Sequence, residues 1–101
     1  MTKKEAIALE ALCEKRLSQI IGYGIEISMN LAGRLKISFD NGEKRFCINK
    51  DLETLGYITF TGEYYDLEYY KDQILKCIKE HKEDFQLLLW SYENIDELED
   101  N

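Results

Sequence analysis

The fold is decided by residues 25–48, which read IEISMNLAGRLKISFDNGEKRFCI. Within this stretch, apolar residues alternate with polar or small ones in three short segments, Ile25–Met29, Leu35–Phe39 and Phe46–Ile48. Successive side chains of a β-strand point to opposite faces of a sheet, so a period of two indicates a strand with one buried face. The stretch therefore predicts three half-buried strands.

The two connections between these segments predict how the strands pair. Asn41-Gly42 is a preferred pair for a two-residue type I′ turn, which would place Ile37 opposite Phe46 and Leu35 opposite Ile48. A two-residue turn at Ala32-Gly33 would put the apolar faces out of step. A three-residue loop with Gly33 in the left-handed conformation keeps them in step. It pairs Met29 with Leu35, Ile27 with Ile37, and Ile25 with Phe39.

The other face of the predicted meander is polar and, on balance, basic. It carries Glu26, Ser28, Arg34, Lys36, Ser38, Arg45 and Cys47. This face is free to meet water or a partner.

Helices are predicted in the chain both before and after the strands. Thr2 and Glu5 fit a capping box, so a helix is expected over about residues 3–21, ending at Gly22 and Gly24. Its apolar stripe is Leu9, Leu12, Cys13, Leu17 and Ile20. Residues 63–101 hold neither glycine nor proline and follow helical spacing. They predict either one long helix or two helices broken near His81-Lys82.

The segment between the sheet and the last helical region is less regular. Residues 51–55 resemble a helical turn or a loop that Gly56 ends, and 57–61 are a candidate fourth strand. The expected fold is therefore α+β, with an N-terminal helix, an antiparallel meander of three or four strands, and one or two C-terminal helices. We expect a single compact domain over residues 1–92 and an acidic, frayed tail over residues 93–101.

Charge is distributed unevenly along the chain. Residues 1–62 carry nine Lys/Arg and eight Asp/Glu, a net charge of +1, whereas residues 63–101 carry four Lys and twelve Asp/Glu, a net charge of −8. Such an acidic half repels nucleic acid and attracts basic protein surfaces. The expected partner is a protein with a basic surface, without direct nucleic-acid binding.

The sequence favours a cytoplasmic location. The longest unbroken apolar run is Leu87–Trp90, far short of the roughly 20 residues that cross a bilayer, and the N-terminus has no secretory h-region. No membrane association is expected. Cys13, Cys47 and Cys77 form no CxxC motif and are interpreted as reduced, buried thiols.

No motif for catalysis or cofactor binding is recognised. Cys77 and His81 lie four residues apart on a predicted helix, a spacing that suits two ligands of one metal, but a zinc site needs two more. Gly22-Tyr23-Gly24 follows a helix, whereas a dinucleotide fingerprint follows a strand. We therefore expect no enzyme activity, no metal and no cofactor.

The segment GEYYDLEYYKD, residues 62–72, is the main candidate binding surface, and we call it the acidic tyrosine segment. Tyrosines give rigid contact area at interfaces, and carboxylates pair with Arg and Lys on a partner. The alternative is that Tyr70 and Tyr64 belong to the core. The candidate partner-binding residues are Glu63, Tyr64, Tyr65, Asp66, Glu68, Tyr69 and Asp72. Leu87 and Trp90, three residues apart, are secondary interface candidates.

Two functions are expected from these features. In size, acidity and element order the chain resembles phage-encoded anti-CRISPR inhibitors and nuclease-toxin immunity proteins, a resemblance of layout from which no functional residue is carried over. It implies an acidic inhibitor that mimics nucleic acid and binds a basic nucleic-acid-binding protein. The alternative is a structural or assembly component that forms a homodimer through its C-terminal helix, where apolar residues recur at alternating four- and three-residue spacing.

Overall fold

The computed structural model describes residues 1–39, 44–48, 55–59 and 65–100. The elements are, in chain order, α1 (Lys3–Ile21), β1 (Ile25–Met29), β2 (Leu35–Phe39), β3 (Lys44–Ile48), β4 (Leu55–Thr59), α2 (Tyr65–Glu80), α3 (Lys82–Glu93) and the short 3₁₀ helix η1 (Ile95–Glu97). The predicted α+β class is confirmed: a helix, an antiparallel meander, and two C-terminal helices.

The sheet is a four-stranded antiparallel meander in the order β1-β2-β3-β4. The predicted register is confirmed in both hairpins, with Ile27 opposite Ile37 and Ile37 opposite Phe46. Gly33 has a φ of 76°, the left-handed conformation that the three-residue loop requires. The side chain of Asn30 closes this loop by accepting hydrogen bonds from the backbone N–H groups of Ala32 and Arg34. The predicted Asn41-Gly42 turn lies outside the described residues.

The fourth strand begins earlier than the sequence predicts. β4 spans Leu55–Thr59, and Gly56, predicted to end a helical turn, pairs with Cys47 inside the strand. The shift lets β4 pair with all five residues of β3, and an edge strand tolerates a glycine in its interior. Residues 51–54, also assigned to that turn, lie outside the described residues.

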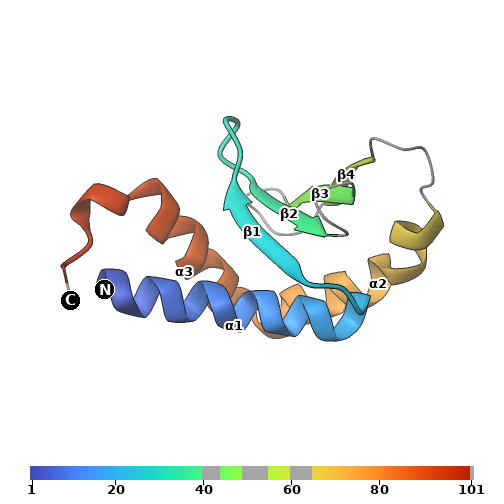
Figure 1. Cartoon of the computed structure of the whole chain (residues 1–101), viewed down its shortest axis with the longest axis horizontal. Helices are drawn as coiled ribbons and strands as arrows, with labels where there is room; N and C mark the ends of the chain where they lie inside the picture. The colour runs from blue at the N-terminus through green and yellow to red at the C-terminus, as the bar shows by residue number, and fades with distance from the viewer. Residues whose placement is uncertain (40–43, 49–54, 60–64, 101) are drawn as a thin grey trace.

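All three α-helices lie on one side of the sheet, as Figure 1 shows. α1 runs along the base of the molecule, and α2 and α3 follow one another back along it in the opposite direction (Figure 1). The core lies between the layers and contains buried residues from the three α-helices and from β1, β2 and β3, among them Leu17, Ile27, Leu35, Ile37, Ile48, Ile78, Phe85 and Leu88.

α1 forms as its sequence predicts. Thr2 and Glu5 make both bonds of the capping box, and Gly22 ends the helix with a φ of 84°. The predicted apolar stripe needs one correction, because Leu12 is exposed whereas Cys13 and Leu17 are fully buried. Leu12 lies at the margin of the stripe, about 100° around the helix from Cys13, and faces away from the core.

The C-terminal helical region is broken at His81, between α2 and α3. The charges around the break suit two helix ends: Lys79 lies in the last turn of α2, and Glu83 and Asp84 lie in the first turn of α3. Cations stabilise the negative end of a helix dipole and anions the positive end. The Arg16 guanidinium, 2.6 Å from Asp84, fixes the start of α3 against α1.

The acidic tail corrects a prediction. Its carboxylates are exposed as expected, but the chain from Ile95 to Asp100 folds back onto the start of α1 instead of fraying. Leu98 is only 7 % exposed, the N–H of Lys3 donates to the carbonyl of Glu99 at 2.8 Å, and Thr2 and Glu99 form a parallel bridge. Burial of one leucine and these backbone bonds hold the two ends of the chain together.

Candidate functional site

A groove lies between the start of α1 and the end of α3, where the two chain ends meet. It has a volume of about 420 Å³ and is lined mainly by apolar side chains: Ala6 and Ile7 from α1, Tyr92 from α3, and Ile95 and Leu98 from the tail. Ile7 and Ile95 are 67 % and 55 % exposed, so much of both side chains remains open to solvent. We call this feature the terminal groove.

The floor of the terminal groove is polar at Glu10 and Tyr92. The Tyr92 hydroxyl is in hydrogen-bond contact with the Glu10 carboxylate and lies 3.2 Å from the carbonyl oxygen of Ile27. Burial raises the pKa of Tyr92, and the hydrogen bond to Glu10 raises it further. The phenol therefore stays protonated and acts as a donor that links α3 to α1 and β1.

Glu14, one turn further along α1 from Glu10, bonds to the other backbone group of Ile27. Its Oε2 accepts a hydrogen bond of 2.9 Å from the N–H of Ile27. Burial raises the pKa of Glu14, and the nearby carboxylates of Glu10 and Glu26 add to the effect. β1 is at the edge of the sheet, where the backbone groups of Ile27 have no strand of the described residues to pair with. Tyr92 bonds to its carbonyl oxygen and Glu14 to its N–H.

The tail, which forms one wall of the terminal groove, is rich in carboxylates. Residues 93–100 carry Glu93, Asp96, Glu97, Glu99 and Asp100, all exposed, and no lysine or arginine. Lys3 lines the groove but pairs with Asp100 at 2.7 Å. The hydrogen bond to Asp100 and its charge raise the pKa of Lys3, and Asp96 contributes to the rise. The charge of Lys3, the cation that lines the groove, is therefore matched by Asp100, and the tail carries further carboxylates.

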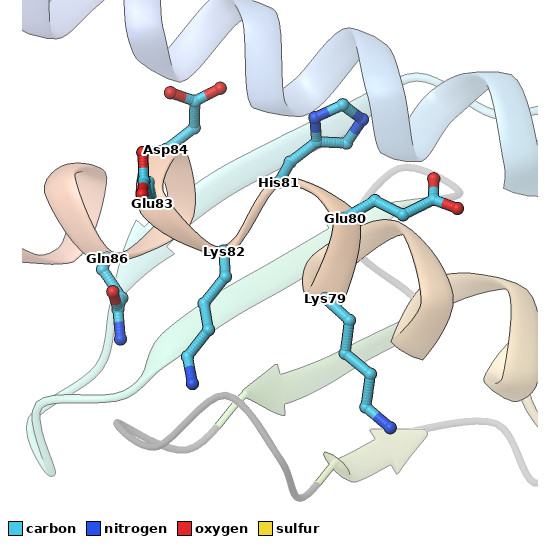
Figure 2. Close-up of a pocket in the computed structure, with 7 residues that line it drawn as sticks. All are labelled: Lys79, Glu80, His81, Lys82, Glu83, Asp84 and Gln86. Atoms are coloured by element: carbon cyan, nitrogen blue, oxygen red, sulfur yellow. The ribbon is translucent and has the colours of Figure 1, made fainter.

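A second hollow, of about 680 Å³, lies at the corner between α2 and α3 and is polar (Figure 2). Figure 2 shows that His81 and Asp84 point toward α1, whereas Lys79, Lys82 and Gln86 point the opposite way. Lysines and carboxylates alternate around the hollow and leave no field of one sign. This corner therefore offers no selectivity for a charged ligand.

Two of the buried thiols, those of Cys13 and Cys77, lie in surroundings that favour the protonated form. Burial raises the pKa of Cys13 to about 12 and also raises the pKa of Cys77. A thiol that stays protonated is neither a nucleophile nor a metal ligand. Within the described part of the chain, no group of three or more His, Cys, Asp or Glu side chains is arranged to hold a metal ion.

The predicted binding residues of the acidic tyrosine segment lie mostly at the start of α2. Glu63 and Tyr64 lie outside the described residues, and α2 begins at Tyr65, so that Asp66, Glu68 and Tyr69 are in its first turns. Asp72 is exposed, and Tyr70 is partly buried against the core, as the alternative interpretation expected.

The secondary candidates, Leu87 and Trp90, are 43 % and 42 % exposed on α3. Their spacing of three residues makes them neighbours on the helix surface. They form an apolar patch separate from the lining of the terminal groove.

Sequence reasoning missed the terminal groove, although two apolar signals lie in the segments that form it. Ile7 lies off the apolar stripe of the first helix, and Ile95 and Leu98 are apolar residues three apart in a tail otherwise made of acids and asparagines. An isoleucine outside the stripe and two apolar residues at a spacing of three indicate that each segment has an apolar contact, but they do not identify the contacting segment.

The chain matches no family model, no curated protein and no solved structure. Across the described residues, every helix is too short or too polar to span a bilayer.

Proposed function

We propose that this chain is a non-enzymatic protein-binding protein that presents carboxylates to a basic, nucleic-acid-binding partner and so takes the place of a nucleic-acid backbone. The observation that supports it is the charge of residues 63–101, four lysines against twelve carboxylates. Most carboxylates of this half with described side chains are exposed: Asp72, Glu80, Glu83, Glu93, Asp96, Glu97, Glu99 and Asp100. Exposed charges of one sign speed association with a surface of the opposite sign.

Competition with nucleic acid is the direct test of this proposal. Basic proteins captured by the immobilised chain at low salt should be released by raising the salt, and also by adding double-stranded DNA. Phosphate-like contacts weaken steeply with salt, because the charges are screened over about 10 Å at ~0.1 M. Partners that resist both salt and DNA would rule out nucleic-acid mimicry.

The acidic tyrosine segment supplies the variants. If the segment is the binding surface, Tyr65→Ala, Tyr69→Ala and the double change Asp66→Lys/Glu68→Lys should weaken binding and leave thermal stability nearly intact, since exposed substitutions cost within about 0.5 kcal/mol. Loss of an aromatic anchor costs on the order of 2 kcal/mol of binding, roughly thirtyfold in affinity. Glu26→Lys, on the exposed face of the sheet, is the charge-reversal control, with half the change in net charge of the double variant.

Stability measurements separate the binding role of these tyrosines from a core role. A core tyrosine replaced by alanine costs on the order of 3 kcal/mol of stability. If the charge-reversal variant folds and binds like the parent, the segment is not the site. The basic sheet face, with Arg34, Lys36 and Arg45, is then the next candidate.

A second candidate function is self-association, which the exposure of Leu87 and Trp90 favours. Two large apolar side chains next to each other on a helix form a surface that a two-fold dimer can cover. Sedimentation at rising concentration tests it: Leu87→Ser/Trp90→Ser should abolish any dimer. A strict monomer at high concentration excludes this function.

A further inference from the structure

We infer that the terminal groove is a second contact of this protein with its basic partner, besides the acidic tyrosine segment, and that it takes an apolar side chain flanked by lysines or arginines. The inference rests on the proposed function and adds to it the location of the site and the chemistry of the segment bound. Three observations carry it: the apolar lining, the exposure of that lining, and the charge around it.

The lining requires an apolar occupant. Ala6, Ile7, Tyr92, Ile95 and Leu98 contribute carbon surface to a volume of about 420 Å³. Removing apolar surface from water is favourable by roughly 25 cal/mol per Å², so exposed isoleucines gain from being covered. A volume of this size holds one or two large side chains from a partner and is too small for a whole helix.

The charges around the groove require that the segment be basic. Glu10 lies in the floor, and Asp96 and Asp100 approach Lys3 at the rim. Because Lys3 is already paired with Asp100, an incoming anion would meet a negative surface. A lysine or arginine next to the apolar side chain in the groove would meet carboxylates of the tail. Glu97 and Glu99 are examples, since they form no ion pair with the described residues.

The groove is also preformed, which lowers the cost of binding. Leu98 is buried, the tail bonds to Met1 and Lys3 through its backbone, and the hydrogen bonds of Tyr92 fix the floor. A rigid site spends less binding free energy on ordering its own side chains. The tail therefore acts as one wall of a site.

Three synthetic peptides of about ten residues test the inference with probes of known chemistry. The first carries two leucines and a tryptophan among lysines, the second replaces the lysines by glutamates, and the third replaces the leucines and the tryptophan by serines. Fluorescence anisotropy gives the affinities, and amide shifts in a ¹⁵N spectrum locate the contact. The first peptide should bind and shift residues 3–10 and 91–98, and the other two should bind at least about tenfold more weakly.

The variant Ile7→Ser/Ile95→Ser should reduce affinity for the first peptide at least about tenfold, since it removes apolar lining from both walls. Leu31→Ser is the matched control, because Leu31 is a fully exposed apolar residue on the β1–β2 loop. It should leave the affinity unchanged. Unfolding curves confirm that the double variant remains folded.

The results separate the site from the function. If the first peptide binds the double variant as tightly as the parent, or shifts residues outside the groove, the inference fails while DNA-competed capture of basic proteins still supports the proposed function. If none of the peptides binds, the inference also fails. A third outcome is that the parent dimerises and that Ile7→Ser/Ile95→Ser and Leu31→Ser each abolish the dimer. The groove is then occupied by the β1–β2 loop of a second copy, and a basic partner segment is excluded as its occupant.

Discussion

Replacing Glu14 by leucine tests the contact that attaches the edge of the sheet to α1. Glu14 Oε2 accepts a 2.9 Å hydrogen bond from the N–H of Ile27, on strand β1 at the sheet edge. Leucine has nearly the same size and keeps the packing, but leaves this N–H without its acceptor. An unsatisfied buried backbone group costs about 1–3 kcal/mol, and we expect a loss of this size in the free energy of unfolding.

Glu14→Gln is the matched variant, since its amide oxygen keeps the acceptor and removes the charge. Burial raises the pKa of Glu14, which means that the fold disfavours its ionised form. At neutral pH the neutral glutamine side chain avoids that cost, and this variant should be at least as stable as the parent.

The same raised pKa gives the parent a pH dependence that the glutamine variant lacks. Between the ordinary carboxyl pKa and the raised one, the folded state holds a proton that the unfolded state has released. The contribution of Glu14 to the free energy of unfolding therefore falls as the pH rises through this window. The difference between parent and Glu14→Gln should shrink on acidification.

Urea unfolding followed by circular dichroism and by the fluorescence of Trp90, the single tryptophan, measures these quantities. Curves at a series of pH values, from below the ordinary carboxyl pKa up to neutral pH, follow the titration. If Glu14→Leu is as stable as the parent, or if Glu14→Gln loses as much as Glu14→Leu, the hydrogen bond to Ile27 does not stabilise the edge and the reasoning is refuted.

Three further predictions concern the tail, the first hairpin and the thiols. Leu98→Ala should cost about 2 kcal/mol of stability and speed hydrogen exchange at the N–H of Lys3; unchanged exchange would mean that the tail is not held by Leu98. Gly33→Ala should cost roughly 1 kcal/mol because of its φ of 76°, and Gly33→Asn should cost less; equal melting temperatures would contradict this. Cys13 should react with iodoacetamide only after unfolding, since burial raises its pKa to about 12; rapid alkylation of the native protein, read by mass spectrometry, would show an open site.

The sheet could be predicted closely because local chemistry determines its register. Alternation fixes which residues face the core, and a single left-handed glycine, Gly33, decides the loop length that keeps both strands in step. The sequence places β4 two residues too late because the start of this strand is not determined locally. The start of this strand depends on pairing with β3, and the sequence around Gly56 resembles a turn when it is taken alone.

The break at His81 and the fold-back of the tail depend on tertiary contacts. Helical spacing continues through His81, and the signals of the break are the charges of Lys79, Glu83 and Asp84 around it. The tail is polar in sequence apart from two residues. Only the meeting of the chain ends gives Leu98 a surface to cover, and no pattern local to residues 93–100 specifies that surface.

The acidic surface could be foreseen from composition, but the terminal groove could not. A count of carboxylates needs no coordinates, and those of the tail are exposed as expected. The groove combines Ile7 with Ile95, which lie near opposite ends of the chain. Residues so distant come together only through the antiparallel packing of α3 on α1, which the sequence alone left open.

The two candidate surfaces lie at opposite ends of the molecule, and this separation limits the kind of partner that uses both. α2 begins at one end of the view in Figure 1 and the chain ends meet at the other, along a longest extent of 41 Å.

Energetic effects of substitutions more than about 10 Å apart usually add. A partner with one small basic patch would therefore respond to variants at one end only. A partner with an extended cationic groove, such as one that accommodates a nucleic-acid strand, would respond to both, and the free-energy losses would sum. Nucleic-acid mimicry therefore predicts that the losses of binding free energy caused by Asp66→Lys/Glu68→Lys and by Ile7→Ser/Ile95→Ser add when the two double variants are combined.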